Sequence, residues 1–268
     1  MITAALILHG MIYAFIGAFA GLMAGILGIG GGLVVVPGLL FVFQKTQIIP
    51  MAIAMHVAAG TSLAVMIITS QASLRAHYQL GDIRWSVYNR LWPGIIIGTI
   101  SGAIAAQWVP TYWLQIIFAF FLLGVALKML MDAKITHSEK SPKPWINHLV
   151  SFFIGFKSGL LGIGGGLLII PYLIYCGVEI RKIAAVSSLC TLTVALIGSM
   201  VFMVTGYHET VAIPYTTGYV YWPAVLLVAT FSSVTAPIGA KLNYIVPVQQ
   251  LKYGFIVILV LTALKMLF

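Results

Sequence analysis

The sequence predicts an all-α polytopic membrane protein made of two homologous halves, each with a glycine-broken first segment and three spanning helices. Charged residues are 7% and hydrophobic residues 61% of the 268 residues, whereas soluble domains carry about 25% charged residues. So few polar groups could not cover the apolar surface in water, which excludes a soluble enzyme, a secreted domain and a disordered chain. A repeated glycine motif predicts the halves, and the length of the first apolar run in each half predicts the break.

The 14 basic and five acidic residues give a net charge of +9. The basic residues are scattered between apolar segments rather than gathered in a stripe, so we expect no nucleic-acid partner. They are expected instead to hold loops on the cytoplasmic side of the bilayer. Cys176 and Cys190 lie in apolar stretches and predict buried thiols rather than a disulfide framework. No pattern indicates a cofactor.

Apolar runs follow one another along the chain. The first half contains Met11–Phe43, Met51–Leu74, Leu91–Val109 and Tyr112–Leu127. The second half contains Leu149–Val178, Ile183–Thr205, Trp222–Ala240 and Leu251–Phe268. A polar stretch separates them and is predicted to be a cytoplasmic linker. The predicted organisation is a first transmembrane repeat over 1–131, a linker over 132–145 and a second transmembrane repeat over 146–268.

The first run of each half is too long for one span. A helix rises about 1.5 Å per residue and the hydrocarbon core is about 30 Å thick, so roughly 20 residues suffice. Both runs carry a glycine cluster that is followed by a proline. Non-helical backbone at membrane depth is stable only inside protein or beside a wet cavity. We therefore expect each first run to be a broken or re-entrant segment.

An internal repeat relates the two halves. Gly25–Pro37 reads GILGIGGGLVVVP and Gly159–Pro171 reads GLLGIGGGLLIIP, with nine of thirteen positions identical. Gly60–Leu63 (GTSL) corresponds to Val186–Leu189 (VSSL), and both halves end in ALKML. Glycine-interrupted segments in matching positions of two halves indicate the binding site of a transporter.

The basic residues change loops between the halves, which favours inverted copies. If each first run is a re-entrant hairpin, each half crosses the membrane three times. Eleven basic residues then lie inside the cell: Arg75, Arg84, Arg90, Lys128, Lys134, Lys140, Lys143, Arg181, Lys182, Lys241 and Lys252. Lys45 and Lys265 lie outside, whereas eight simple spans would divide the basic residues eight against five. The positive-inside rule prefers the inverted arrangement.

The glycine clusters are the first candidate site. Without side chains, their backbone N–H groups can turn toward one point, and a helix that begins there adds its dipole. Both features favour an anion. The candidate substrate-binding residues are accordingly Gly28, Gly30, Gly31, Gly32, Gly162, Gly164, Gly165 and Gly166. Close helix packing is the alternative, because membrane helices also use glycine at their contacts.

The two glycine motifs and the GTSL element resemble the sulfite exporter TauE/SafE family of bacterial membrane transporters. The resemblance extends over essentially the whole chain, although the second GTSL element is degraded to VSSL. Members are associated with sulfite, sulfonates and other small sulfur-containing anions. The resemblance therefore implies a small-anion permease, often an exporter, without specifying the anion.

Hydroxyl and basic side chains complete the candidate site. Thr61, Ser62, Ser187 and Ser188 occupy matching positions in the repeats and could donate to an oxyanion; bonding to their own helices is the alternative. Lys157 lies in an apolar run and is expected either to attract the anion or carry a proton, or to snorkel. His56 is expected to be a structural residue or to couple transport to protons.

The predicted function is transport of a small oxyanion by alternating access in a bacterial inner membrane. A passive anion channel and an intramembrane enzyme are the alternatives. The enzyme would need a nucleophile with a base or a metal cluster, and the six histidines are too scattered to form one. No acidic residue lies well inside an apolar run, which disfavours metal cations as substrate. The sequence leaves the oligomeric state open.

Overall fold

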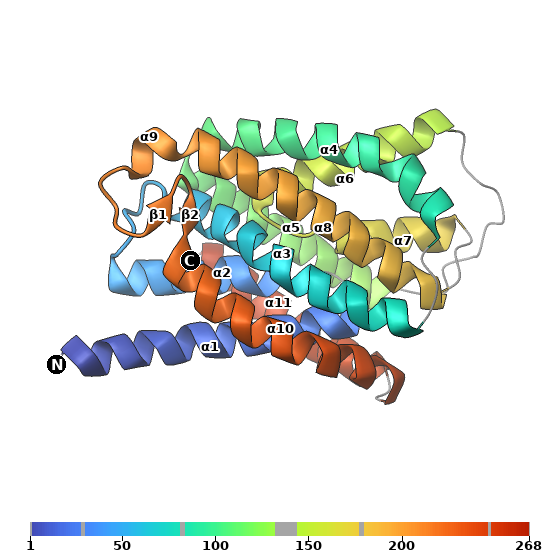
Figure 1. The fold of residues 1–268 in the computed structure, drawn as a ribbon, viewed down its shortest axis with the longest axis horizontal. Coiled ribbons are helices and arrows are strands. Elements are labelled where there is room, and N and C mark those ends of the chain that lie inside the picture. The colour runs from blue at the N-terminus through green and yellow to red at the C-terminus, as the bar shows by residue number, and fades with distance from the viewer. Residues whose placement is uncertain are drawn as a thin grey trace.

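The computed structural model describes residues 2–27, 30–80, 84–131, 144–176, 180–245 and 248–267. These residues form eleven helices and one small hairpin (Figure 1). The first half of the chain contains α1 (Ile2–Leu27), α2 (Gly32–Thr46), α3 (Ala54–Leu80), α4 (Trp85–Gln107) and α5 (Thr111–Met131). The second half contains α6 (Pro144–Leu161), α7 (Gly166–Tyr175), α8 (Ile180–Thr205), α9 (Tyr207–Thr210), β1 (Thr216–Thr217), β2 (Val220–Tyr221), α10 (Trp222–Ile245) and α11 (Val248–Leu267).

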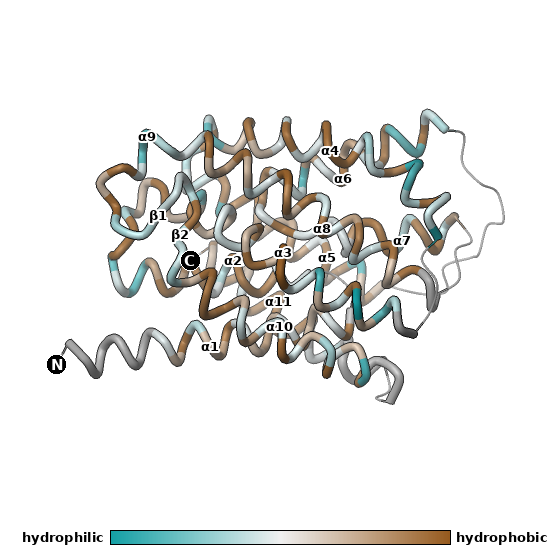
Figure 2. The backbone as a smooth tube through the Cα atoms, in the orientation of Figure 1, coloured by the Kyte–Doolittle hydropathy of each residue, from teal (hydrophilic) through white to brown (hydrophobic). Residues whose placement is uncertain are grey.

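The helices have the length and composition of a multi-pass membrane protein. Among the residues that the structure describes, four stretches of helix are long and apolar enough to cross a bilayer: Ala54–Tyr78, Thr111–Met131, Ile183–Thr205 and Trp222–Leu242. Three shorter apolar helices accompany them: Gly10–Ile26, Gly32–Thr46 and Ile256–Leu267. Hydrophobic residues follow the middle of the helices, and hydrophilic residues gather toward the two ends of the bundle (Figure 2).

The first long apolar run breaks at its glycine cluster, as predicted. α1 ends before the cluster and α2 begins at Gly32. α2 then runs back along α1, because Gly31 lies against Ala20 whereas Gly38 lies against Ile16. The run is therefore a helical hairpin rather than one span.

The second long run breaks in the same way, between α6 and α7. Gly165, at the start of α7, lies beside Ile154 and Ser158 near the end of α6. Tyr172, further along α7, donates a hydrogen bond to Asn147 near the start of α6. α7 is thus antiparallel to α6, as α2 is to α1.

Two pairs of parallel helices form the flanks of the bundle. On one flank, α1 packs along α10; Gly17, Gly21 and Gly25 of α1 face, in order, Val228, Ser232 and Ala236 of α10. On the other, α4 packs along α6; Gly94, Gly98 and Gly102 of α4 face, in order, Ser151, Phe152 and Phe156 of α6. Because glycine lacks a side chain, the backbones in each pair approach closely.

α3 and α8 pack against each other in the centre of the bundle and are antiparallel (Figure 1). Gly60 lies near Phe202, whereas Ser73, further along α3, has its Oγ 3.2 Å from that of Ser188. α3 is parallel to α10, and α4 is parallel to α8. α1, α3 and α10 therefore run in one direction, and α4, α6 and α8 run in the other.

The helix ends differ from the ends of the apolar runs. α3 continues past Leu74 to Leu80, and α4 begins at Trp85 rather than Leu91. Hydropathy marks where a helix leaves the apolar layer, not where its backbone hydrogen bonds stop. Most of the predicted linker, 132–143, lies outside the described residues, but Pro144 and Trp145 belong to α6. Pro144 is its first residue, a position that suits proline because the missing N–H has no helical partner.

Candidate functional site

The two glycine loops meet inside the bundle. A Cβ added to Gly32 would lie 3.1 Å from the carbonyl oxygen of Gly162 and 3.1 Å from the Cα of Ile163. The predicted site glycines from both loops are buried: Gly30, Gly31, Gly32, Gly162, Gly164, Gly165 and Gly166. Gly28 lies outside the described residues. One loop from each half of the chain therefore contributes to a shared region.

One face of α3 lies against both loops. A Cβ on Gly162 would lie 2.4 Å from the Cα of Ala59, and a Cβ on Gly32 would lie 3.0 Å from Sδ of Met66. Ser62 is between Ala59 and Met66 on this face, since residues three and four apart on a helix are neighbours. The sequence therefore places the Ser62 hydroxyl on the side of α3 that meets the loops.

α8 closes the region from the opposite side. A Cβ added to Gly30 would lie 2.4 Å from Cγ2 of Thr191 and 3.3 Å from Sδ of Met66, so Gly30 contacts both α8 and α3. We call the following set the loop junction: Gly30, Gly31, Gly32, Ala59, Ser62, Met66, Gly162, Ile163 and Thr191.

Two helices begin at the loops without a side-chain cap. Gly31 caps α2 and Gly165 caps α7, and neither cap makes a side-chain hydrogen bond within the described residues. The N–H groups of Val34 and Val35 already bind the carbonyl of Gly31, so Gly32 and Leu33 carry the first-turn N–H groups that the helix itself cannot satisfy. The positive end of the α2 dipole therefore lies at the loop junction, and α7 begins three residues after Ile163.

Two hydroxyls of the loop junction are buried without a partner. Ser62 and Thr191 are both 0% exposed, and their oxygens accept or donate no hydrogen bond within the described part of the chain. A buried polar group that lacks a partner costs about 1–3 kcal/mol, so such groups are rare unless a ligand or water completes them. The loop junction thus holds two buried hydroxyls that no protein group in the described residues satisfies.

The other predicted hydroxyls have structural partners. The backbone N–H of Tyr221 donates to Oγ1 of Thr61 at 3.0 Å, which fastens β2 to α3. Ser188 pairs with Ser73 and joins α8 to α3. Ser187 is buried on α8, one turn before Thr191.

The structure does not bring Lys157 to the loop junction. Its side chain is exposed on α6, whereas the neighbouring Ser158 and Gly159 form the buried face of that helix. The position does not support an anion-attracting role for Lys157. A lysine on the outer face of a membrane helix can instead extend its ammonium group toward the interface.

His56 joins two helices rather than facing the loops. Its Nε2 lies 3.0 Å from the carbonyl oxygen of Ala106 at the end of α4, to which an Nε2–H would donate, and its ring packs 5.2 Å from that of Tyr219. These contacts describe a structural histidine, and a proton-coupling role receives no support from them.

His77 is a buried polar residue that the sequence reasoning did not select. It is 2% exposed, and neither ring nitrogen has a partner with hydrogen-bond geometry in the described part of the chain. Ser62, Ser70, Ser73 and His77 are all buried and follow one another on α3 at steps of eight, three and four residues. This helical spacing of polar residues is the signal that could have identified a polar stripe leading away from the loop junction.

Gly31→Ala and Gly165→Ala are expected to behave differently although the residues match in the repeat. Gly31 has φ +80°, and a Cβ there would lie 2.9 Å from the carbonyl oxygen of Ala20. Gly165 has φ −61°, and a Cβ there would meet only side-chain atoms, at 3.1 Å or more. A left-handed backbone costs a non-glycine residue about 1–2 kcal/mol. We expect Gly31→Ala to lower the melting temperature in detergent and Gly165→Ala to change it little. Equal effects would contradict the loop conformations.

Comparison with known proteins gives one consistent result. The family profile described as "Sulfite exporter TauE/SafE" matches residues 13–266. A probable membrane transporter protein of Haemophilus influenzae is 34% identical over 94% of this chain and 95% of its own length. One of Methanocaldococcus jannaschii is 30% identical over 88% of this chain and 87% of its own, and one of Bacillus subtilis is 26% identical over 74% and 79%. No solved structure matches the chain.

Proposed function

The chain belongs to the sulfite exporter TauE/SafE family, a family of membrane transporters rather than enzymes, and from this premise we propose that it exports a small oxyanion. The membrane is the plasma membrane of a bacterium, and the mechanism is alternating access around the loop junction. The proposed ligands of the anion are the N–H groups at the starts of α2 and α7, and the hydroxyls of Ser62 and Thr191.

The main support for this proposal is that Gly32 lies directly against Gly162 and Ile163. This contact brings the two glycine loops together beside two buried hydroxyls that have no described protein partner. N–H and O–H groups donate to an oxyanion without bringing a charge of their own. None of the five acidic residues belongs to the helices α1, α2, α3, α6, α7 or α8, so no carboxylate of these helices would repel the anion.

The directions of the helices support inverted repeats. α1 and α6 would be equivalent, and they run in opposite directions; α4 and α10 would also be equivalent, and they too are opposed. Each half's first helix packs on a late helix of the other half, α1 on α10 and α6 on α4. A two-fold axis in the membrane plane would exchange these pairs. A tag between Gly206 and Tyr221 should then be accessible from outside the cell, and a cytoplasmic tag would refute the inversion.

The two glycine loops differ in conformation, which agrees with alternating access. Gly31 is left-handed and its repeat partner Gly165 is not. Inverted repeats that exchange two conformations produce an outward-open and an inward-open state. In any one of these states, the two equivalent loops must therefore have different conformations.

The hairpin before α10 is the proposed outer gate. Tyr219 is 1% exposed; its carbonyl covers Gly60, and its ring packs against those of His56 and Phe202. Burial, and then the Glu209 carboxylate, raises the pKa of the Tyr219 phenol. We propose that the neutral phenol, beside the Glu209 carboxylate, helps to hold the hairpin closed.

A binding screen tests the proposed substrate class. The purified protein is heated with sulfite, sulfate, thiosulfate, short sulfonates and carboxylates, each matched with sodium and potassium counter-ions. At 100 times its dissociation constant a ligand stabilises the fold by about 2.7 kcal/mol, so an oxyanion should raise the melting temperature by several degrees. Stabilisation by cations alone would overturn the proposal. Saturable uptake into vesicles distinguishes a transporter from a passive channel, whose flux would not saturate.

A further inference from the structure

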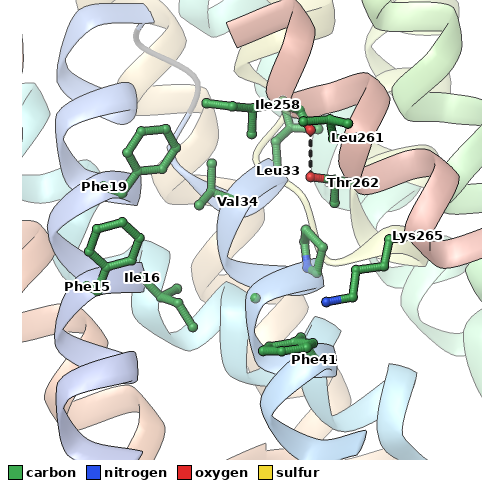
Figure 3. Close-up of a pocket in the computed structure, with 12 residues that line it drawn as sticks. Phe15, Ile16, Phe19, Leu33, Val34, Phe41, Ile258, Leu261, Thr262 and Lys265 are labelled. Carbon is green, nitrogen blue, oxygen red and sulfur yellow. Dashed lines mark hydrogen bonds between the residues drawn. The ribbon is translucent and has the colours of Figure 1, made fainter. Parts of the chain in front are cut away.

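An apolar groove opens between α1, α2 and α11. It encloses about 490 Å³. Its lining is aromatic and aliphatic apart from Thr262 and Lys265, and Figure 3 shows Phe15 and Phe19 of α1 along one side and residues of α11 along another. Thr262 donates its hydroxyl to the carbonyl of Ile258 in its own helix, so it offers no free donor to an occupant.

The α2 side of the groove is long enough for part of an acyl chain. Leu33 and Phe41 line it from opposite ends of its α2 side, and eight residues of helix extend about 12 Å. Phe15 and Leu261, on its two rims, are 72% and 61% exposed, so the groove opens to the outside of the bundle. In a chain of this hydropathy that surface faces lipid, and a hydrocarbon chain is the occupant that an apolar wall in a bilayer admits.

A basic side chain stands at one end of the groove. The ammonium Nζ of Lys265 lies 3.3 Å from the centre of the Phe41 ring, and the ring orients it beside the groove (Figure 3). Lys45 is one turn beyond Phe41 on α2, and its charge acts on Lys265. Both lysines are exposed, so a negatively charged headgroup could reach them.

These two lysines are also the exceptions in the charge pattern of the chain. On the inverted arrangement they are the basic residues assigned to the outer side, against eleven inside. Positive charge is not needed there for topology. Their convergence at the end of one apolar groove is therefore better explained by a ligand than by chance placement of loops.

We propose that this groove binds an anionic phospholipid, with one acyl chain along α2 and the phosphate beside Lys265 and Lys45. The phosphate would sit at the helix ends where the interface lies, and the acyl chain would brace α2 against α1 and α11. Because Leu33 follows directly after Gly32, the bound chain would reach the edge of the loop junction. The site is separate from the proposed anion site and stands whether or not that proposal holds.

Native mass spectrometry of the purified protein tests this site. The probes are phosphatidylglycerol and phosphatidylcholine with identical acyl chains, added at equal concentration. We expect phosphatidylglycerol to be retained preferentially. A basic residue near an anionic headgroup contributes about fivefold in binding, so Lys265→Gln and Lys45→Gln should each reduce the preference by about that factor. Lys128→Gln is the matched control, because Lys128 occupies the same ALKML motif on α5 and does not line the groove.

A groove-filling variant tests the acyl chain separately. Val34→Phe adds a ring inside the groove and should reduce retention of both lipids, while its melting temperature in lipid-free detergent stays close to that of the wild type. Equal retention of the two lipids, or preference unchanged in Lys265→Gln, would overturn the proposal. A dimer that Val34→Phe dissociates would show that a second copy fills the groove instead. Competition by inorganic phosphate alone would show a phosphate site without a lipid.

Discussion

Gly98→Ala is expected to separate α4 from α6 and to prevent the protein from folding stably. A Cβ at this position would lie 2.1 Å from the carbonyl oxygen of Phe152, a backbone atom that cannot rotate away. The two helices must move apart, and the contacts of the flanking Gly94 and Gly102 are lost with them. Overpacking usually costs about 1–3 kcal/mol and more when backbone must move, so we expect a loss of about 3 kcal/mol or greater. The melting temperature in detergent measures it.

Gly124→Ala is the matched control. Gly124 is within α5, and a Cβ there would meet nothing within 4 Å in the described part of the chain. Alanine favours a helix interior over glycine by about 1 kcal/mol, so this variant should be as stable as the wild type or slightly more stable. If Gly98→Ala and Gly124→Ala melted at the same temperature, the close approach of α4 and α6 would be wrong.

The sequence predicted the breaks in the fold better than the pairing of its helices. The repeated GxGGG cores located both breaks because three glycines in an overlong apolar run permit few other structures. Helix pairing was not predicted, since these helices are apolar on all sides and give no amphipathic stripe to indicate a buried face. The spacing Gly94, Gly98 and Gly102 carried that information, because glycines four apart form one flat face.

The candidate site was predicted in part for the same reason. The glycine loops could be predicted as part of the site because the backbone conformation of such loops depends on glycine itself. The hydroxyls can be chosen from the sequence by residue type but not by the direction of the side chain. Thr61 and Ser188 join structural elements, and Thr191 was not among the predicted residues. Lys157 was selected by its charge, but its exposure depends on which side of α6 packs on α4, and that requires the tertiary structure.

Ser62→Ala combined with Thr191→Val is expected to abolish most transport while making the protein more stable. Each substitution removes a buried hydroxyl that has no described protein partner and leaves a group of similar size. Removing such an unpaired group relieves a cost of about 1–3 kcal/mol, so the melting temperature without substrate should rise. A bound oxyanion would lose two hydrogen-bond donors. Because about 1.4 kcal/mol of binding free energy corresponds to a tenfold change in affinity, we expect transport to fall at least tenfold.

The opposite signs of these two effects separate a binding site from a structural one. If the hydroxyls only packed against the loops, the double variant would transport normally. If they stabilised the fold, the double variant would have a lower melting temperature than the wild type. Ser188→Ala provides the contrast, because it breaks the bond to Ser73 and should cost about 1 kcal/mol while leaving transport intact. Lys157→Met should also leave transport intact, since its side chain is exposed on α6. Only hydroxyls that donate to a ligand are expected to destabilise the protein without substrate and to stabilise it when substrate is bound. Saturating oxyanion should therefore stabilise the wild type more than the double variant, although the empty variant begins at the higher melting temperature.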